Sequence, residues 1–270
     1  MEPLFDSSVL EKKQQQLRGN FFVVADFDKT LTKAVSNNRP TVNAIGVFRH
    51  GDYINPEYVQ KAFALKQHFG PFEYDHDGPL DKRNELMNEW WKKHLTLFVQ
   101  YGLTQDIVKQ AATDGQLVLR DGVKEFLELL HKHNIPVIIF SAGIKDVIYH
   151  FLKHKNILFD NMTIFANEFA YQEKKVIGYR SLIIHSLNKH DSSLLQLPQL
   201  KIKQTNILLL GDSLTDANMS NHFSHQHCLK IGFLNGDVDY IDKFKQSYDI
   251  VFIDETSYDW INTFTKRLVS

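Results

Sequence analysis

The sequence of 270 residues has little cysteine, no excess of charge of one sign and no long apolar run. Its single cysteine, Cys228, cannot form a disulfide within the chain, which fits a reducing compartment. The net charge of −1 and pI near 6.9 provide no basic field for a nucleic-acid polymer or an anionic membrane. We therefore expect a local site to meet the charge of any anionic ligand.

The longest apolar runs fall far short of the roughly 20 residues that cross a bilayer. They cover residues 21–25, 135–140 and 207–210. The N-terminal 20 residues are too polar for the apolar part of a signal peptide. We expect a cytoplasmic protein without a membrane partner. Its 43% hydrophobic and 23% charged residues are typical of a globular chain that can form a sizeable core.

Short apolar runs, bounded by glycine, aspartate or serine, indicate the strands of a sheet. They lack polar alternation, which is typical of strands buried on both faces of a parallel sheet. The runs are FFVVADF (21–27), IPVIIFSAG (135–143), NILLLGDS (206–213), CLKIGFL (228–234) and YDIVFID (248–254). Helical spacing at 122–133 and 145–154 lies between them. Alternating strands and helices predict an α/β fold, with helices on both faces of a mostly parallel, doubly wound sheet.

One long stretch interrupts this alternation. Residues 34–118 are rich in aromatic and charged residues with helical spacing, and they contain no strand of the core type. We expect a core domain of residues 1–33 and 119–270, with a helical cap domain of residues 34–118 over the end of the first strand. A second irregular stretch, 165–179, predicts a hairpin or a strand with a polar turn.

Two aspartates, Asp26 and Asp28, stand where the first predicted strand ends. Ligands gather at the carboxyl ends of parallel strands, and charged side chains are seldom buried unless they are paired or bind metal. Such a pair can bind a divalent cation and divide nucleophilic attack and proton transfer between them. Taken alone, a helix-capping aspartate with a solvated neighbour explains the pair equally well.

Three further elements favour the functional interpretation because of their order and position. Ser141, which ends the second predicted strand, and Ala142 after it can form a phosphate cradle, although an N-cap serine is a common alternative. Asp212 ends another strand, and Asp216 can hold a metal-bound water or orient Lys189. A turn rich in Asp and Ser is the simpler explanation of the segment GDSLTD (211–216). Lys189 taken alone is weak evidence, because lysines are common on protein surfaces.

These residues resemble the signature of the haloacid dehalogenase superfamily of phosphatases. The signature is DxDxT, a hydroxyl residue after a strand, a lysine and an acidic pair in a GDSxxD motif. They occur here in that order as Asp26/Asp28/Thr30, Ser141, Lys189 and Asp212/Asp216. Five segments also resemble the cytosolic pyrimidine 5'-nucleotidase family, or cytosolic 5'-nucleotidase III. They are FSAGIKDV (140–147), LNKHDSSL (187–194), LLLGDSLTD (208–216), LKIGFLN (229–235) and SYDIVFIDE (247–255).

The resemblance covers the chain from about residue 21 to the end and implies a Rossmann-like core with a helical cap. It implies Asp26 as nucleophile and Asp28 as general acid and then base. It also implies Mg²⁺ held by Asp26, the backbone carbonyl of Asp28, and Asp212. Ser141, Ala142 and Lys189 would bind the phosphate.

The cap supplies the base-binding residues in this family. A glutamate contacts the base, an aromatic residue after Glu-Trp stacks on it, and a serine follows three residues later. The matching positions are Glu73, Trp91 and His94, the last a departure from the family pattern. Tyrosine is usual at the aromatic position of pyrimidine-preferring members, whereas tryptophan is similar to the branch accepting 7-methylguanosine monophosphate.

Simpler explanations of these cap residues stay open. Glu73 can belong to a solvated acidic loop with Asp75 and Asp77, which we slightly favour. Trp90 and Trp91 can be a helix-packing pair. Because adjacent helical positions point about 100° apart, we expect one of them in the core and the other at the cleft.

The sequence thus predicts a magnesium-dependent phosphomonoesterase for a small phosphorylated metabolite. The expected substrate is a nucleoside 5'-monophosphate, with a pyrimidine or 7-methylguanosine base, hydrolysed through an aspartyl-phosphate on Asp26. One rival is the same chemistry on phosphoserine or a sugar phosphate, because the cap alone decides the substrate. Another is a non-catalytic ligand-binding protein on an inherited phosphatase fold. No oligomeric state is indicated.

Overall fold

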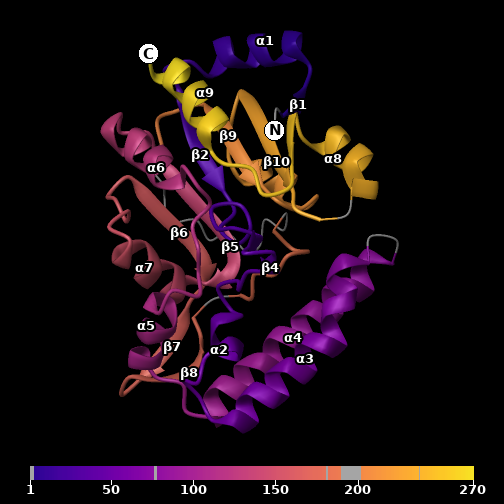
Figure 1. Cartoon of the computed structure of the whole chain (residues 1–270), viewed down its shortest axis with the longest axis vertical. Helices are drawn as coiled ribbons and strands as arrows, with labels where there is room; N and C mark the ends of the chain where they lie inside the picture. The colour runs from indigo at the N-terminus through magenta and orange to yellow at the C-terminus, as the bar shows by residue number, and fades with distance from the viewer. Residues whose placement is uncertain (1–2, 76–77, 181, 190–201, 237) are drawn as a thin grey trace.

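A central sheet of seven strands organises the chain (Figure 1). The computed structural model describes residues 3–75, 78–180, 182–189, 202–236 and 238–270. In spatial order the strands are β1 (Leu4–Phe5), β11 (Ile250–Ile253), β10 (His227–Leu234), β9 (Asn206–Gly211), β2 (Phe21–Ala25), β5 (Val137–Ile144) and β6 (Met162–Asn167). Neighbours run parallel except β1 and β11, which are antiparallel. The predicted mostly parallel sheet is confirmed.

Both faces of the sheet are buried, as the missing polar alternation predicted. Along β2, Phe21, Val23 and Ala25 join one hydrophobic cluster, whereas Phe22 and Val24 join another. Burying each large apolar side chain contributes about 1.5–3 kcal/mol. The helices of the core are α1 (Ser7–Leu17), α6 (Val123–Lys132), α7 (Lys145–His154), α8 (Ile241–Ser247) and α9 (Asp259–Val269), with 3-10 helices η2 (Asp216–His222) and η3 (Val238–Tyr240). α6, α7 and α9 contribute to the first cluster, and η2 and α8 contribute to the second.

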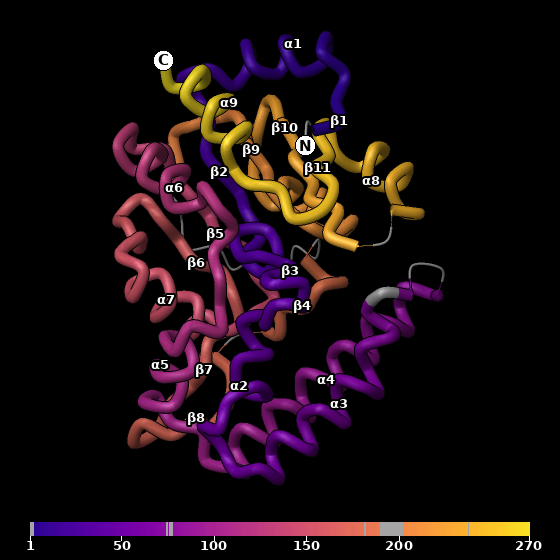
Figure 2. The backbone as a smooth tube through the Cα atoms, in the orientation of Figure 1, coloured from indigo at the N-terminus to yellow at the C-terminus, as the bar shows by residue number. Residues whose placement is uncertain are grey.

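The chain between β2 and β5 is mainly helical, as expected. Its elements before α6 are β3 (Val35–Ser36), β4 (Arg39–Pro40), α2 (Val47–His50), α3 (Pro56–Tyr74), α4 (Leu80–Gln100) and α5 (Gln105–Thr113). The sequence did not predict the small β3–β4 hairpin. Pro56 and the side chain of Asn55, which accepts from Glu57 N at 2.7 Å, begin α3. α3 and α4 form a two-helix arm beside the sheet (Figures 1 and 2).

Contacts with the core hold this helical segment in place. α5 packs on α7, and α4 packs against a hairpin of β7 (Phe169–Gln172) and β8 (Lys175–Tyr179). That hairpin confirms the prediction for residues 165–179. An antiparallel bridge between Thr32 and Leu119 brings together the two connections to the sheet. None of the helices in the described ranges is long and apolar enough to cross a bilayer.

Candidate active site

The register of β2 and β9 brings two predicted acids to one edge of the sheet. Ala25 pairs with Leu210, and Asp26 N donates to the carbonyl of Leu210 at 3.0 Å. Asp26 and Asp212 therefore leave neighbouring parallel strands at the same end, where ligands of open α/β sheets bind.

A buried lysine, Lys189, bridges Asp26 and a third acid, Asp216. Lys189 Nζ donates to Asp26 Oδ1 and, at 2.8 Å, to Asp216 Oδ1. The residues Asp26, Lys189 and Asp216 are only 4%, 3% and 1% exposed. Asp216 Oδ2 accepts from the backbone N–H groups of Asp212 at 3.1 Å and Ser213 at 3.0 Å. Asp216 thus positions both Lys189 and the Asp212 turn, one of the two roles considered for it. The LNKHDSSL motif lies outside the described residues from position 190 on.

The cluster holds more carboxylates than cations, and this excess changes its titration. Burial raises the pKa of Asp28 to about 6 and the pKa of Asp212 to about 7. Burial also raises the pKa of Asp26 well above its ordinary value, although Lys189 opposes the shift. Burial alone would lower the pKa of Lys189, but Asp216 and Asp26 raise it above its ordinary value. The lysine is therefore charged, and the acids can take up protons or a cation.

Asp28 lies beside the predicted phosphate cradle. Its Oδ1 accepts from Ala44 N at 2.8 Å. The hydroxyl of Ser141 accepts from Gly143 N at 2.9 Å. A Cβ at Gly143 would lie 2.7 Å from the Cβ of Ala44 and 3.2 Å from both Asp28 Oδ2 and Ser141 Oγ, so this close approach requires glycine.

The strand bearing Ser141 runs further than predicted. β5 continues to Ile144, and its pairing with β6 is irregular between Phe140 and Ile144. Ser141 lies in this irregular stretch instead of ending the strand. Ile144 precedes α7, so Ser141 is not the N-cap residue. An irregularity in strand pairing changes the direction of the side chains there. Ser141 and Ala142, which lie in the irregular stretch, line the cavity.

The acidic cluster suits a divalent cation. Carboxylate oxygens of Asp26, Asp212 and Asp216 lie within 4.8 Å of one another. Both oxygens of Asp216 already accept hydrogen bonds from the chain, whereas the Asp212 carboxylate accepts none from the residues described. A set of oxygen ligands with two available carboxylates fits a hard cation that keeps several waters.

Every residue predicted for the site lines one cavity of about 850 Å³. These residues are Asp26, Asp28, Glu73, Trp91, His94, Ser141, Ala142, Lys189, Asp212 and Asp216. The acidic cluster, the cradle and Lys189 occupy one end, and residues of α2, α3 and α4 line the other. The cavity therefore joins the sheet edge to the helices, and its volume can hold a ligand larger than a phosphate ion.

Two predictions about the helical end need correction. Glu73 lies in the last turn of α3 and lines the cavity, so the favoured explanation of a solvated loop is wrong. Asp77, assigned to that loop, is outside the described residues. Trp91 belongs to the main hydrophobic core, as expected of one of the pair, but both Trp90 and Trp91 line the cavity. Trp90 stacks on Phe69 with ring centroids 6.3 Å apart, so it also contributes to helix packing.

His94 is a buried, neutral residue. Its Nε2 lies 3.0 Å from the hydroxyl of Tyr58, and its ring stacks on Phe98. Burial, reinforced by Arg49, lowers its pKa well below the ordinary value. It can therefore offer a neutral imidazole nitrogen to a ligand.

Three supporting residues were missed by sequence reasoning. Asn167 Nδ2 donates to the carbonyls of Ala142 at 2.9 Å and Ile184 at 2.7 Å, which ties the cradle to the segment leading to Lys189. The hydroxyl of Tyr248 donates to the carbonyl of Ser213 under the Asp212 turn. Arg49, in α2, is buried at the helical end of the cavity. Asn167 and Arg49 lie in none of the segments that carry the family resemblance, and Tyr248 lies in one of them, SYDIVFIDE (247–255), where nothing in the sequence marked it as a support of the site.

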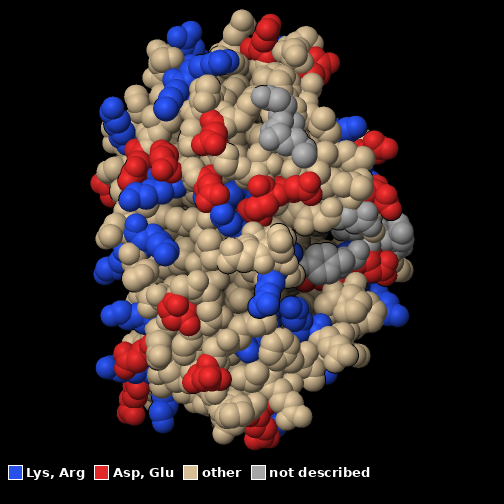
Figure 3. Space-filling model, in the orientation of Figure 1, with Lys and Arg blue, Asp and Glu red and all other residues tan. Residues whose placement is uncertain are grey.

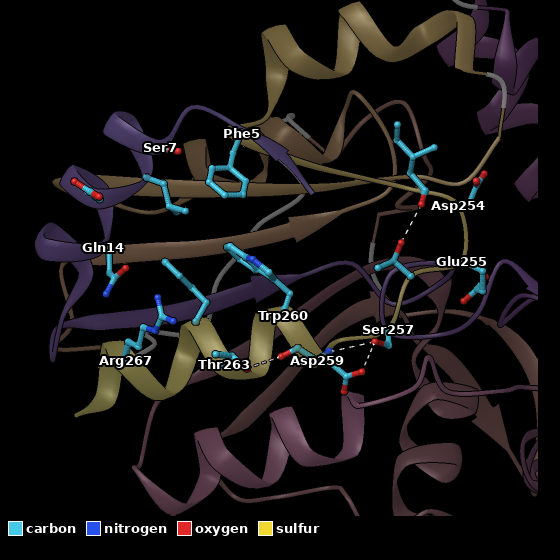
Figure 4. Close-up of a pocket in the computed structure, with 15 residues that line it drawn as sticks. Phe5, Ser7, Gln14, Asp254, Glu255, Ser257, Asp259, Trp260, Thr263 and Arg267 are labelled. Carbon is cyan, nitrogen blue, oxygen red and sulfur yellow. Dashed lines mark hydrogen bonds between the residues drawn. The ribbon is translucent and has the colours of Figure 1, made fainter. Parts of the chain in front are cut away.

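A second cavity, of about 810 Å³, lies between the N-terminal segment, the end of β11 and α9 (Figure 4). The rings of Phe5 and Trp260 border it, and Ser257 donates to Asp259 at 2.7 Å beside it. It contains none of the predicted site residues. The candidate active site is therefore the first cavity.

The doubly wound sheet, with helices inserted between β2 and β5, has the fold of haloacid dehalogenase-type phosphatases. Its overall likeness to a phosphoserine phosphatase, solved as a phospho-aspartyl intermediate analogue, shows that fold alone. The TM-score is 0.51 at 15% identity, over 94% of this chain and 100% of that one.

Residues 29–269 match the sequence profile of the pyrimidine 5'-nucleotidase (UMPH-1) family, and the chain belongs to this family. It is 32% identical over 245 residues to 7-methylguanosine phosphate-specific 5'-nucleotidase A of Xenopus laevis, which covers 89% of this chain and 84% of the relative. The structure is similar to that of cytosolic 5'-nucleotidase IIIB bound to cytidine. The TM-score is 0.90 at 26% identity, over 98% of this chain and 93% of that one. The resemblance noted from the sequence is confirmed.

Proposed function

We propose that this protein is a magnesium-dependent phosphatase that hydrolyses nucleoside 5'-monophosphates through an aspartyl-phosphate on Asp26. The observation that supports it most strongly is the convergence of Asp26, Asp28, Lys189 and Asp212 at one end of a cavity that continues to aromatic helices. The names of the Xenopus relative and of the cytidine-bound structure support a nucleotide as substrate.

Mg²⁺ would be held by Asp26, Asp212 and the backbone carbonyl of Asp28. Phosphatases of this fold generally use this ion, and the oxygen-only cluster fits it. When bound, it offsets negative charge on the phosphate and on the carboxylates. Lys189 adds a fixed positive charge, and the Ser141 hydroxyl and the backbone of Ala142 orient the phosphate oxygens.

Asp26 and Asp28 divide the covalent chemistry. The carboxylate of Asp26 attacks phosphorus, so an Asp26–phosphorus bond forms while the bond to O5' of the nucleoside breaks. Asp28, with its pKa raised by burial to about 6, gives its proton to O5'. It then takes a proton from water, whose oxygen attacks phosphorus and releases Asp26 and inorganic phosphate. The hydrogen bond from Ala44 fixes the orientation of Asp28 in both steps.

Residues 34–118 would act as a cap on a core of residues 1–33 and 119–270. Their helices form the base end of the cavity, where Trp91 offers a stacking surface of about 1–3 kcal/mol and Glu73 and His94 offer polar contacts. Closure of the cap over the substrate would exclude water and opening would release products. A cytoplasmic location is supported by the name of a Caenorhabditis elegans relative, putative cytosolic 5'-nucleotidase 3, which is 29% identical.

Phosphate release from a panel of monophosphates tests the function. Cytidine, uridine and 7-methylguanosine 5'-monophosphates are compared with phosphoserine and a sugar phosphate, each with Mg²⁺ and with a chelator. We expect turnover of at least one nucleotide with Mg²⁺, loss of turnover with the chelator, and loss in Asp26→Asn. If all nucleotides are refused while phosphoserine or the sugar phosphate turns over, the nucleotidase assignment is wrong. If nothing turns over, the phosphatase assignment is wrong.

A further inference from the structure

The helical end of the cavity holds a buried cation, the side chain of Arg49, with no hydrogen-bond or ion-pair partner within the described ranges. Arg49 is only 4% exposed, and its Nε and Nη1 make no hydrogen bond to the part of the chain that the structure describes. Trp90 Nε1 and His94 Nδ1, in residues lining the same cavity, likewise have no partner among the described residues. Buried polar groups are nearly always paired, and an unpaired buried charge is costly. Arg49 and Trp90 are donors that need acceptors, and His94 Nδ1 can donate or accept depending on the tautomer of the ring. The three groups indicate that a ligand supplies the missing partners.

The charges at this end favour an electron-rich ligand. Arg49, Lys66 and Arg83 line the cavity there, against the single carboxylate of Glu73 among the described lining residues of the helices. Arg83 already donates to the carbonyls of Phe72 and Glu73, each at 2.8 Å. The side chain of Arg49 makes no such hydrogen bond to the residues that the structure describes, so its guanidinium is available to a ligand. A site in which cations outnumber anions attracts acceptors and repels a second cation.

The short segment that carries Arg49 also contacts the catalytic end of the cavity. Ala44 donates to Asp28 Oδ1 at 2.8 Å, and the turn that follows is closed by Gly46 N donating to Asn43 Oδ1 at 2.8 Å. Arg49 N donates to the carbonyl of Gly46 at 2.9 Å. One short segment thus connects the acid that protonates the leaving oxygen to the guanidinium at the other end. Arg49 is therefore fixed by the same loop as Asp28.

We propose that Arg49 selects the base of the nucleotide substrate. It accepts a neutral base that offers oxygen or nitrogen acceptors and disfavours the positively charged 7-methylguanine ring. This inference rests on the proposed nucleotidase function and refines its substrate class. The expected preference differs from that of the Xenopus relative, whose name states specificity for 7-methylguanosine phosphate. A charged guanidinium can hydrogen-bond such acceptors in a forked geometry that lysine cannot reproduce.

The test compares guanosine with 7-methylguanosine 5'-monophosphate, which differ by one methyl group and one charge, and adds cytidine 5'-monophosphate. Activity is measured with Mg²⁺ below neutral pH, where 7-methylguanine keeps its charge. We expect kcat/KM to be higher for guanosine than for 7-methylguanosine monophosphate. In Arg49→Gln the ratio between them should fall at least about tenfold, because a hydrogen bond to a charged group and the repulsion are both removed. Cytidine monophosphate should also lose about tenfold in kcat/KM.

Two controls separate base selection from a structural role. Arg49→Lys keeps the charge, so it should still disfavour 7-methylguanosine monophosphate while losing activity on cytidine monophosphate. Ribose 5-phosphate has no base, so its kcat/KM should change less than about twofold in Arg49→Gln. An unchanged ratio of the two purine nucleotides in Arg49→Gln, or an equal loss on ribose 5-phosphate, would overturn the role of Arg49. Turnover of ribose 5-phosphate with refusal of all nucleotides would instead overturn the nucleotidase function.

Discussion

Replacing Lys189 with methionine should destabilise the protein to an extent that grows with pH. The lysine neutralises Asp26 and Asp216 in a site where all three are at most 4% exposed. Removing one partner of a buried ion pair costs about 3–5 kcal/mol because it leaves an uncompensated charge. In Lys189→Met one of these carboxyls avoids that charge by keeping a proton in the folded state.

The pH dependence follows from this proton. In the unfolded chain the carboxyl has an ordinary pKa of 3.8 and is ionised at both about pH 5.5 and about pH 8. The folded variant therefore binds one more proton than its unfolded state, and its stability falls by about 1.4 kcal/mol per pH unit. In the wild type, Lys189 stays charged in both states over this range because its folded pKa is raised. The extra loss in the variant is at most about 3 kcal/mol between the two pH values, because the raised pKa of Asp26 gives the wild type part of the same trend.

Urea unfolding with a chelator present measures this loss at both pH values. Lys13→Met is the matched control. Lys13 Nζ donates to Asp249 at 2.6 Å, but its side chain is 26% exposed. That variant should lose about 1 kcal/mol or less, without a pH trend, because its carboxylate remains accessible to water. A loss for Lys189→Met that is equal at both pH values, or no larger than the control, would refute the reasoning.

Two further predictions concern the acidic cluster and the turn that carries it. Mg²⁺ should raise Tm more at about pH 8 than at about pH 5.5, as measured by calorimetry. The reason is that burial raises the pKa of Asp212 to about 7, so at the lower pH the ion must displace a proton. An equal rise in Tm at both pH values would contradict this. Gly211→Ala should abolish most activity and weaken the Mg²⁺ effect, because its Cβ would collide with Asp216 and lie 2.9 Å from the Tyr248 hydroxyl. Gly178→Ala, whose Cβ meets no atom within 4 Å, is the control and should keep both, so similar behaviour of the two variants would argue against this packing.

The sheet and its acidic edge could be predicted because both follow from short-range pattern. Short apolar runs without polar alternation are typical of strands in a sheet that is covered on both faces. Once the strands are parallel, their carboxyl ends meet at one edge, so Asp26 and Asp212 come together without further information. The end of β5 was harder, because the irregular pairing between Phe140 and Ile144 leaves no signal in the residue types.

Lys189 shows where pattern alone fails. It stands in a polar stretch, and lysines are mostly exposed. Its burial depends on Asn167, which holds the carbonyls of Ala142 and Ile184 and so fixes the path of the chain that leads to it. Those partners lie 25 and 17 residues from Asn167 in sequence, and only the folded chain brings them together. The family resemblance identified the lysine, whereas its own surroundings in the sequence did not.

The helical end was least predictable because its cavity lies between elements whose relative placement no local rule sets. Adjacent residues of a helix point about 100° apart, which predicts one buried tryptophan and one at the cavity only if the cavity borders a narrow face of the helix. Here the cavity borders both Trp90 and Trp91. Arg49 is the stronger case, since a charged residue in a four-residue helix is expected to be exposed. It is instead buried, and its Nε and Nη1 have no hydrogen-bond partner in the described chain. Local rules fail where a site is built to meet a ligand, so a buried arginine that breaks them is the residue to test for substrate selection.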